Sequence, residues 1–128
     1  MKKVYFLLGC VLAVVVLLTA CGKKAPPLQL PEAKAVTSVA VTAGGTTEIH
    51  LEEEWIEQMM EDFINAEPTG RESVQDAPLA EDCLKIEIQP ETGDAITLFA
   101  YQEKGQEYLE QPYQGIYQLG EEAWQRLH

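Results

Sequence analysis

The sequence has few residues of the kinds that form covalent cross-links or metal sites. Its 128 residues include 3 cysteines and 2 histidines, and their spacing matches no zinc-binding motif. Cys10 lies in an apolar run near the N-terminus, so only Cys21 and Cys83 remain for the rest of the chain. A disulfide framework is therefore excluded, and the folded part must depend on its hydrophobic core.

Basic side chains are also scarce. Nine Lys and Arg residues stand against 21 Asp and Glu residues, which gives a formal net charge of −12, and every acid lies after residue 31. This excess of negative charge opposes binding to phosphate backbones, so we expect no nucleic-acid partner. The sequence also lacks a G-x-S-x-G motif, a phosphate-binding Gly-rich loop and an EF-hand loop. We therefore expect no cofactor, no bound metal and no catalytic residues.

What the sequence does have is an export signal. Lys2 and Lys3 precede an uncharged stretch over residues 4–22. A basic start, an apolar run and a small-residue exit are typical of a secretory signal peptide. The tetrad at residues 18–21, Leu-Thr-Ala-Cys, resembles the lipobox of bacterial lipoproteins, in which the cysteine thiol is diacylated and the cysteine becomes the first residue. We therefore expect a signal peptide over residues 1–20 and lipidation at Cys21.

This address predicts a protein bound to the cell membrane through a lipid anchor, on its extracytoplasmic face. Two acyl chains anchor a protein stably where one does not. An uncleaved transmembrane anchor is the alternative, because 19 uncharged residues are long enough to span a bilayer. Both interpretations place the folded part outside the cytoplasm.

The segment after Cys21 has the composition of a linker. Residues 22–35 contain Pro26, Pro27 and Pro31 and show no hydrophobic periodicity. Such a segment predicts a semi-extended tether that rises about 3 Å per residue. We expect residues 21–35 to hold a single small domain, residues 36–128, away from the membrane.

Hydrophobic periodicity predicts the first elements of this domain. Residues 36–41 and 47–51 alternate, and Gly44 and Gly45 between them favour a hairpin. The period then becomes helical over residues 51–66, where one apolar face is expected to cover a sheet. This face contains Trp55, Ile56, Met59, Met60, Phe63 and Ile64.

The second half of the domain predicts further strands. Residues 71–82 have no period and are expected to form an ordered loop, while residues 84–89 and 95–102 have the pattern of strands. Residues 106–119 predict a further strand interrupted at Pro112, and a short helix closes the chain at residues 121–127. The expected fold is α+β, an antiparallel sheet of about five strands in the order β-β-α-β-β-β-α with one amphipathic helix on one face.

Few residues have the pattern of a catalytic or metal site. Cys83 and His50 are the candidate Cys-His pair, but neither has a catalytic motif around it. Asp76, Glu81 and Asp82 are candidates for an irregular divalent-cation site. A small envelope enzyme or enzyme inhibitor, and a divalent-cation-binding domain, therefore stay as alternative functions.

Two segments stand out as candidates for recognition. Ser73 and Asp76 have the spacing of a local side-chain cap, and residues 108–117 contain three tyrosines with a proline and a glycine. Tyrosine combines a rigid apolar face with a polar tip and is common in recognition surfaces, but it also occurs in strand cores. The candidate binding surface is Ser73, Asp76, Tyr108, Glu110, Gln111, Tyr113 and Tyr117.

Residues 36–42, 67–78 and 108–117 resemble a family of small, uncharacterised lipoproteins of Gram-positive bacteria, described as a domain of unknown function. The resemblance covers about three quarters of the chain and implies a location at the cell membrane and the boundaries of the domain. It implies no activity and no catalytic residues. We therefore expect a membrane-tethered extracytoplasmic binding module for a protein, peptide or envelope component.

Overall fold

The computed structural model describes residues 27–78 and 82–128. The expected signal peptide, its transmembrane alternative, Cys21 and Glu81 lie outside the described residues. None of the helices in the described part of the chain is long and apolar enough to cross a membrane. The elements are η1 (Ala33–Ala35), β1 (Val36–Ala43), β2 (Thr46–His50), α2 (Glu53–Ile64), β3 (Glu67–Pro68), β4 (Leu84–Pro90), β5 (Ile96–Glu103), β6 (Gln106–Gln111), β7 (Gly115–Gln118) and α3 (Glu121–Arg126).

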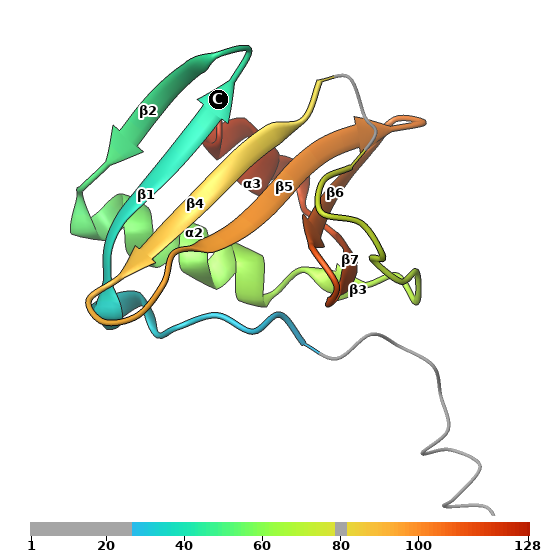
Figure 1. The fold of residues 1–128 in the computed structure, drawn as a ribbon. Coiled ribbons are helices and arrows are strands. Elements are labelled where there is room, and N and C mark those ends of the chain that lie inside the picture. The colour runs from blue at the N-terminus through green and yellow to red at the C-terminus, as the bar shows by residue number, and fades with distance from the viewer. Residues whose placement is uncertain (1–26, 79–81) are drawn as a thin grey trace, which may run out of the picture.

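The strands form one antiparallel sheet, and the helices α2 and α3 lie on one side of it (Figure 1). The strand order is β2-β1-β4-β5-β6-β7-β3, and consecutive strands from β4 to β7 are joined as hairpins. The α+β class predicted from the sequence is confirmed. The predicted helix and the strands at residues 36–41, 84–89 and 95–102 also form, with small shifts at their ends.

The expected number of about five strands is corrected to seven. Residues 106–119 form two strands, β6 and β7, instead of one interrupted strand. Pro112 has no N–H for a strand ladder, Tyr113 has a left-handed φ of 63°, and the Gln114 N–H donates to the Gln111 carbonyl at 2.9 Å. These features reverse the chain in a tight turn. The seventh strand, β3, is only two residues long and pairs with β7.

The β1–β2 hairpin has the turn that the sequence predicts. Gly44 and Gly45 have φ values of 56° and 85°, which a two-residue type I′ turn requires and which glycine adopts without steric cost. The expected packing of the helix is also present. Ile56, Met59, Met60 and Phe63 of α2 are buried against the sheet, and burying one such side chain stabilises a fold by about 1.5–3 kcal/mol.

The sheet presents its alternate residues to the helices, as strand geometry requires. Leu84, Ile86 and Ile88 of β4 are buried on the helix side while Lys85 is exposed. Across the sheet, Leu109 of β6 lies opposite Ala100 and Tyr117, and all three belong to the same core. The residues between them, such as Glu110, therefore point to the other face. Around Glu110 that second face is also buried, because the segment over residues 69–78 covers it there and the Ser73 hydroxyl reaches the Glu110 carboxylate.

The expected linker of residues 21–35 needs a correction in its described half. Leu28, Leu30 and Ala33 pack against the core, and residues 33–35 form the 3-10 helix η1. Side-chain amides also hold this segment: the Gln29 N–H donates to Gln111 Oε1 at 3.1 Å, and Gln111 Nε2 donates to the Gln29 carbonyl at 3.3 Å. Leu28, Leu30 and Ala33 are partly buried while Gln29 and Glu32 are exposed, so the segment packs along the domain instead of standing free.

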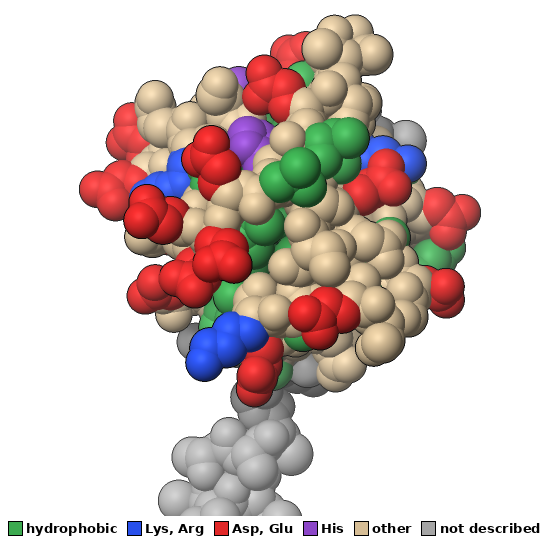
Figure 2. All heavy atoms as spheres, turned by 90° about the vertical axis from the view of Figure 1, so that its left-hand side faces the viewer, with side chains coloured by type: hydrophobic (Ala, Val, Ile, Leu, Met, Phe, Trp, Pro, Cys, Tyr) green, Lys and Arg blue, Asp and Glu red, His purple; other side chains and the backbone are tan. Residues whose placement is uncertain are grey.

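The acidic side chains are spread over the surface. Residues 33–128 contain 20 acidic and 5 basic residues. Figure 2 views the edge of the sheet at β2 and shows carboxylates across it, with a small group of apolar side chains between them. At this edge Ile49 is 65% exposed and Leu51 is 69% exposed. A large excess of one charge sign on a surface favours solubility and opposes self-association.

Candidate functional site

The second face of the sheet holds a buried carboxylate, Glu110 of β6. Its side chain is only 1% exposed. Glu110 Oε2 accepts a hydrogen bond from the Ser73 hydroxyl at 2.8 Å, and Oε1 accepts one from the Tyr101 hydroxyl at 3.1 Å. Burial of a carboxylate is costly unless hydrogen bonds replace its water. Among the described residues, no basic nitrogen forms an ion pair with this carboxylate. The two hydroxyl donors are therefore the groups that compensate for its lost hydration.

The loop and the β6–β7 turn are joined through the same serine. The Ser73 hydroxyl oxygen accepts a hydrogen bond from the Tyr113 N–H at 3.2 Å, and the same hydroxyl donates its own hydrogen bond to Glu110. The Tyr113 hydroxyl donates to Asp76 Oδ1 at 2.6 Å, which raises the pKa of that hydroxyl. One buried serine and one turn tyrosine therefore fix the loop over the sheet.

Burial and the charge of Glu110 control the protonation of two neighbouring groups. Burial, with a smaller contribution from the Glu110 carboxylate, raises the pKa of the Cys83 thiol from 9.0 to about 11. Burial is also the main cause that raises the pKa of the Tyr101 hydroxyl, followed by the charge of Glu110 and the hydrogen bond to it. Both groups remain protonated at neutral pH. Tyr101 is thus a permanent donor to the carboxylate, and Cys83 is a poor nucleophile.

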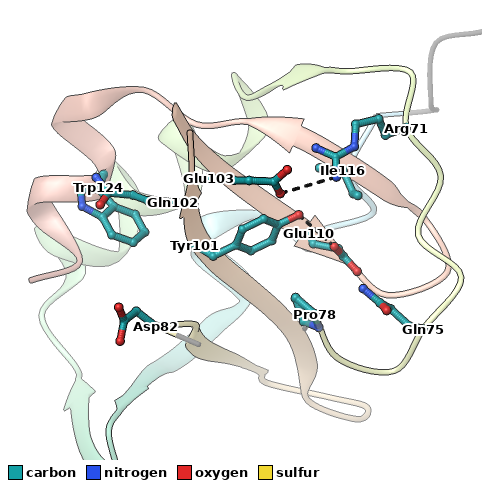
Figure 3. A pocket seen from close by; sticks show the side chains of 10 residues that line it. All are labelled: Arg71, Gln75, Pro78, Asp82, Tyr101, Gln102, Glu103, Glu110, Ile116 and Trp124. Atoms are coloured by element: carbon teal, nitrogen blue, oxygen red, sulfur yellow. Dashed lines mark hydrogen bonds and ion pairs between the residues drawn. The ribbon is translucent and has the colours of Figure 1, made fainter. Parts of the chain in front are cut away.

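An open pocket of about 680 Å³ lies beside this carboxylate. Figure 3 shows its lining side chains around one opening, with the Tyr101 hydroxyl pointing toward Glu110. The lining comes from the loop, the sheet and α3, and it mixes charged, amide and aromatic groups. It consists of Arg71, Gln75, Pro78, Asp82, Tyr101, Gln102, Glu103, Glu110, Ile116 and Trp124.

Arg71 supplies the positive charge of the pocket. Its guanidinium lies 3.7 Å from Glu103 Oε2 and 5.5 Å from the centre of the Tyr108 ring. The backbone holds its position, because the Arg71 carbonyl accepts the Ile116 N–H at 3.2 Å. Half of the Arg71 side chain remains exposed. The pocket therefore presents one cation next to the carboxylates of Glu103 and Glu110.

The structure brings together most of the residues that the sequence marks for binding. Ser73, Asp76, Glu110 and Tyr113 form one hydrogen-bonded group, and Tyr108 lies under Arg71. The other two residues lie elsewhere. Gln111 holds the N-terminal segment, and Tyr117 is wholly buried in the core on the helix side of the sheet, where burial raises the pKa of its hydroxyl.

Sequence reasoning missed several residues of the pocket. Arg71, Tyr101, Glu103 and Trp124 come from three separate parts of the chain. The one signal was the pattern of residues 95–102, which is apolar on both faces and indicates a strand that is covered on both sides. That pattern shows burial of Tyr101 but does not identify the segment that covers it.

The candidate Cys-His pair and the candidate cation site are not assembled among the described residues. Val39 of β1 lies opposite both His50 and Ile88, so His50 is at the Ile88 end of β4, whereas Cys83 precedes the other end of that strand. His50 instead stacks on Trp55 with 3.6 Å between ring centres. For the cation site, Glu81 lies outside the described residues, and residues 27–78 and 82–128 contain no group of three His, Cys, Asp or Glu side chains placed to hold a metal.

Comparison with known proteins gives a family and a solved structure. The model of the DUF5301 family, described as a domain of unknown function (DUF5300), matches residues 24–118. An NMR structure of a protein from Ruminococcus gnavus is similar over 77% of this chain and 99% of that one, with 30% identity and a TM-score of 0.65. Comparison with curated proteins gave no match.

Proposed function

We propose a binding function for this chain, which belongs to the DUF5301 family of domains of unknown function. In this proposal the protein is an extracytoplasmic lipoprotein of a Gram-positive bacterium. It binds a peptide or another polar component of the cell envelope in the pocket between residues 69–78 and strands β5 to β7. It acts as a binding module and not as an enzyme.

One observation carries this proposal: a buried carboxylate that two hydroxyls hold in place at an open pocket. Ligand pockets in proteins range over about 300–1,000 Å³ and place a few polar groups precisely. Here the volume is about 680 Å³ and the polar groups include Arg71, Gln75 and Gln102. A ligand with charges of both signs fits such a lining, since the guanidinium and the carboxylates are adjacent.

The proposed address is supported by residues 1–24. The basic start, the apolar run and the Leu-Thr-Ala-Cys tetrad have the features of a lipoprotein signal. Metabolic labelling with palmitate tests this part. The wild-type protein is expected to incorporate label, and Cys21→Ala is expected to incorporate none. Label that persists in Cys21→Ala would refute the lipidation site.

Photo-crosslinking in intact cells tests the pocket. A photoreactive residue replaces Gln75, which lines the pocket and is half-buried, in cells that naturally make the protein. Mass spectrometry then identifies the adduct. In the Arg71→Glu background the adduct yield is expected to fall at least about tenfold, because like charges placed in contact cost several kcal/mol and every 1.4 kcal/mol of binding free energy is about tenfold in affinity.

Lys85→Glu is the matched control for Arg71→Glu. The two basic side chains are equally exposed, each 49%, and each lies close to a glutamate that is 44% exposed, but Lys85 does not line the pocket. The adduct yield is expected to stay at the wild-type level in Lys85→Glu. An equal loss in both variants, or no adduct in the wild-type protein, would reject this pocket as the binding site.

A further inference from the structure

The described chain begins next to the β6–β7 turn. Gln114 Nε2 donates to the Pro27 carbonyl at 3.2 Å, and the side chain of Gln111 makes two hydrogen bonds to the backbone of Gln29. Leu28 and Leu30 pack against the core. The start of the described chain is therefore held against the domain, and Figure 1 shows this blue segment running below the sheet.

The chain between this point and the expected lipid anchor is short. Cys21 and Pro27 are six residues apart, and six residues of fully extended chain span at most about 20 Å. The lipidated cysteine must remain at the membrane surface, because its acyl chains lie in the bilayer. Lys23 and Lys24 add an attraction of about 1 kcal/mol each to anionic headgroups. The end of the domain that carries Pro27 thus stays within about 20 Å of the membrane.

Two large exposed apolar side chains lie at this same end, and we name Val74 and Tyr113 the rim. Tyr113 is in the β6–β7 turn and is 67% exposed, while Val74 is 75% exposed. The Tyr113 N–H is bonded to the hydroxyl of Ser73, the residue before Val74. The hydrogen bond between Tyr113 and Asp76 also holds the ring. Tyrosine is favoured at the level of lipid headgroups, where its ring is in an apolar layer and its hydroxyl in a polar one.

We infer that the rim faces and contacts the lipid headgroup layer of the membrane in which Cys21 is anchored. This inference rests on the lipid anchor proposed above. Hydrogen bonds to Ser73 and Asp76 hold Tyr113 before it meets the membrane, so its contact orders few additional groups. Two side chains on an acidic domain bind lipid weakly, and the anchor supplies the affinity. The rim therefore sets the orientation, and it brings the pocket under residues 69–78 close to the bilayer.

Fluorescence quenching by brominated lipids tests this orientation. The lipidated full-length mature protein is reconstituted into phosphatidylcholine and phosphatidylglycerol vesicles with bromine near the headgroups. Tyr113→Trp reports from the rim, and Ile49→Trp reports from the opposite edge of the sheet at a similar exposure, 65% against 67%. The signal of wild-type Trp55 and Trp124 is subtracted. The fluorescence added by Tyr113→Trp is expected to fall by about half, and that added by Ile49→Trp to stay unchanged.

The outcomes separate the two proposals. Flotation of the wild-type protein with vesicles comes first, and a protein that does not float refutes both the anchor and the rim contact. A protein that floats but shows equal quenching for the two tryptophans, or none at Tyr113→Trp, overturns the rim contact and leaves the anchor standing. Val74→Trp is the second rim variant if Tyr113→Trp fails to give the wild-type circular dichroism spectrum. The fluorescence added by Val74→Trp is likewise expected to fall by about half, and absent or equal quenching would overturn the rim contact.

Discussion

Glu110 shows how a single side chain shapes the second face of the sheet. It occupies a strand position with Phe99 and Ile116 directly opposite, both of them buried and apolar. A carboxylate among such residues is stable only when donors reach both oxygens. Ser73 and Tyr101 are those donors. The loop over residues 69–78 is therefore held to the sheet by the hydrogen bond from Ser73 to the Glu110 carboxylate as well as by apolar packing.

Replacing Ser73 tests this dependence. Ser73→Ala leaves Glu110 Oε2 without its donor and the Tyr113 N–H without its acceptor. The free energy of unfolding in urea is expected to fall by about 2 kcal/mol, since unsatisfied buried polar groups cost about 1–3 kcal/mol. Ser38 of β1 is half-buried and gives the matched control, Ser38→Ala. Equal losses in the two variants would show that the buried carboxylate does not depend on Ser73.

The Cys83 thiol provides a pH-dependent measurement of the same site. Its pKa is about 11 in the folded protein against an ordinary 9.0, so at pH 8 the thiolate is about 100-fold rarer than in the unfolded chain. Alkylation of Cys83 by iodoacetamide, followed by mass spectrometry of its peptide, is expected to be slower by that factor in the native protein. Similar rates in native and urea-unfolded protein at pH 8 would contradict this.

The same shift implies a direction for stability. A thiol whose folded pKa is raised contributes its full stabilisation below pH 9, and this contribution is lost as the pH rises from 9 through about 11. The raised pKa of Tyr101 acts in the same direction. The melting temperature is therefore expected to fall above pH 9, and less steeply in Cys83→Ala than in the wild-type protein.

At the scale of elements, the tight turns decide where strands end. The β5–β6 turn has left-handed φ values at both central residues, 52° at Lys104 and 77° at Gly105. These values give the two-residue I′ turn that matches the twist of the flanking strands. Lysine is a poor residue for such a position, because its Cβ approaches the following carbonyl.

Two substitutions in this turn are expected to change stability in opposite directions. Lys104→Asn creates the Asn-Gly pair that I′ turns prefer and should raise the free energy of unfolding by about 0.5–1 kcal/mol. Gly105→Ala should lower it by about 1–2 kcal/mol, and the cost is purely conformational, because an added Cβ meets nothing within 4 Å. Thermal and urea unfolding measure both. A loss of stability in both variants would show that the turn is not of this type.

At the scale of the whole molecule, the N-terminal segment belongs to the domain. A chain that begins at Pro27 keeps Leu28 and Leu30 against the core, while a chain that begins at Pro31 loses both. The shorter chain is expected to be less stable by about 2 kcal/mol, in line with the partial burial of two leucines. Urea unfolding of the two chains measures the difference. Equal stability would support the free linker that the composition of residues 22–35 predicts.

The amino-acid sequence alone predicts most of the local elements, because their signals are short-range. The 3.6-residue period of α2, the alternation of β4 and the Gly44–Gly45 turn each lie within a dozen residues. It also determined the class, since hairpins beside one amphipathic helix lead to an antiparallel α+β sheet.

Which distant residues come into contact is visible only in the folded chain. The two-residue β3 has no periodicity to detect, and Tyr113 and Tyr117 of one short segment end in a turn and in the core. Ser73 and Glu110 are 37 residues apart and Gln29 and Gln111 are 82 apart. Such contacts depend on which segment covers each face of the sheet. Pairing between distant segments leaves no pattern in a single sequence, since each partner alone has the properties of an ordinary surface residue.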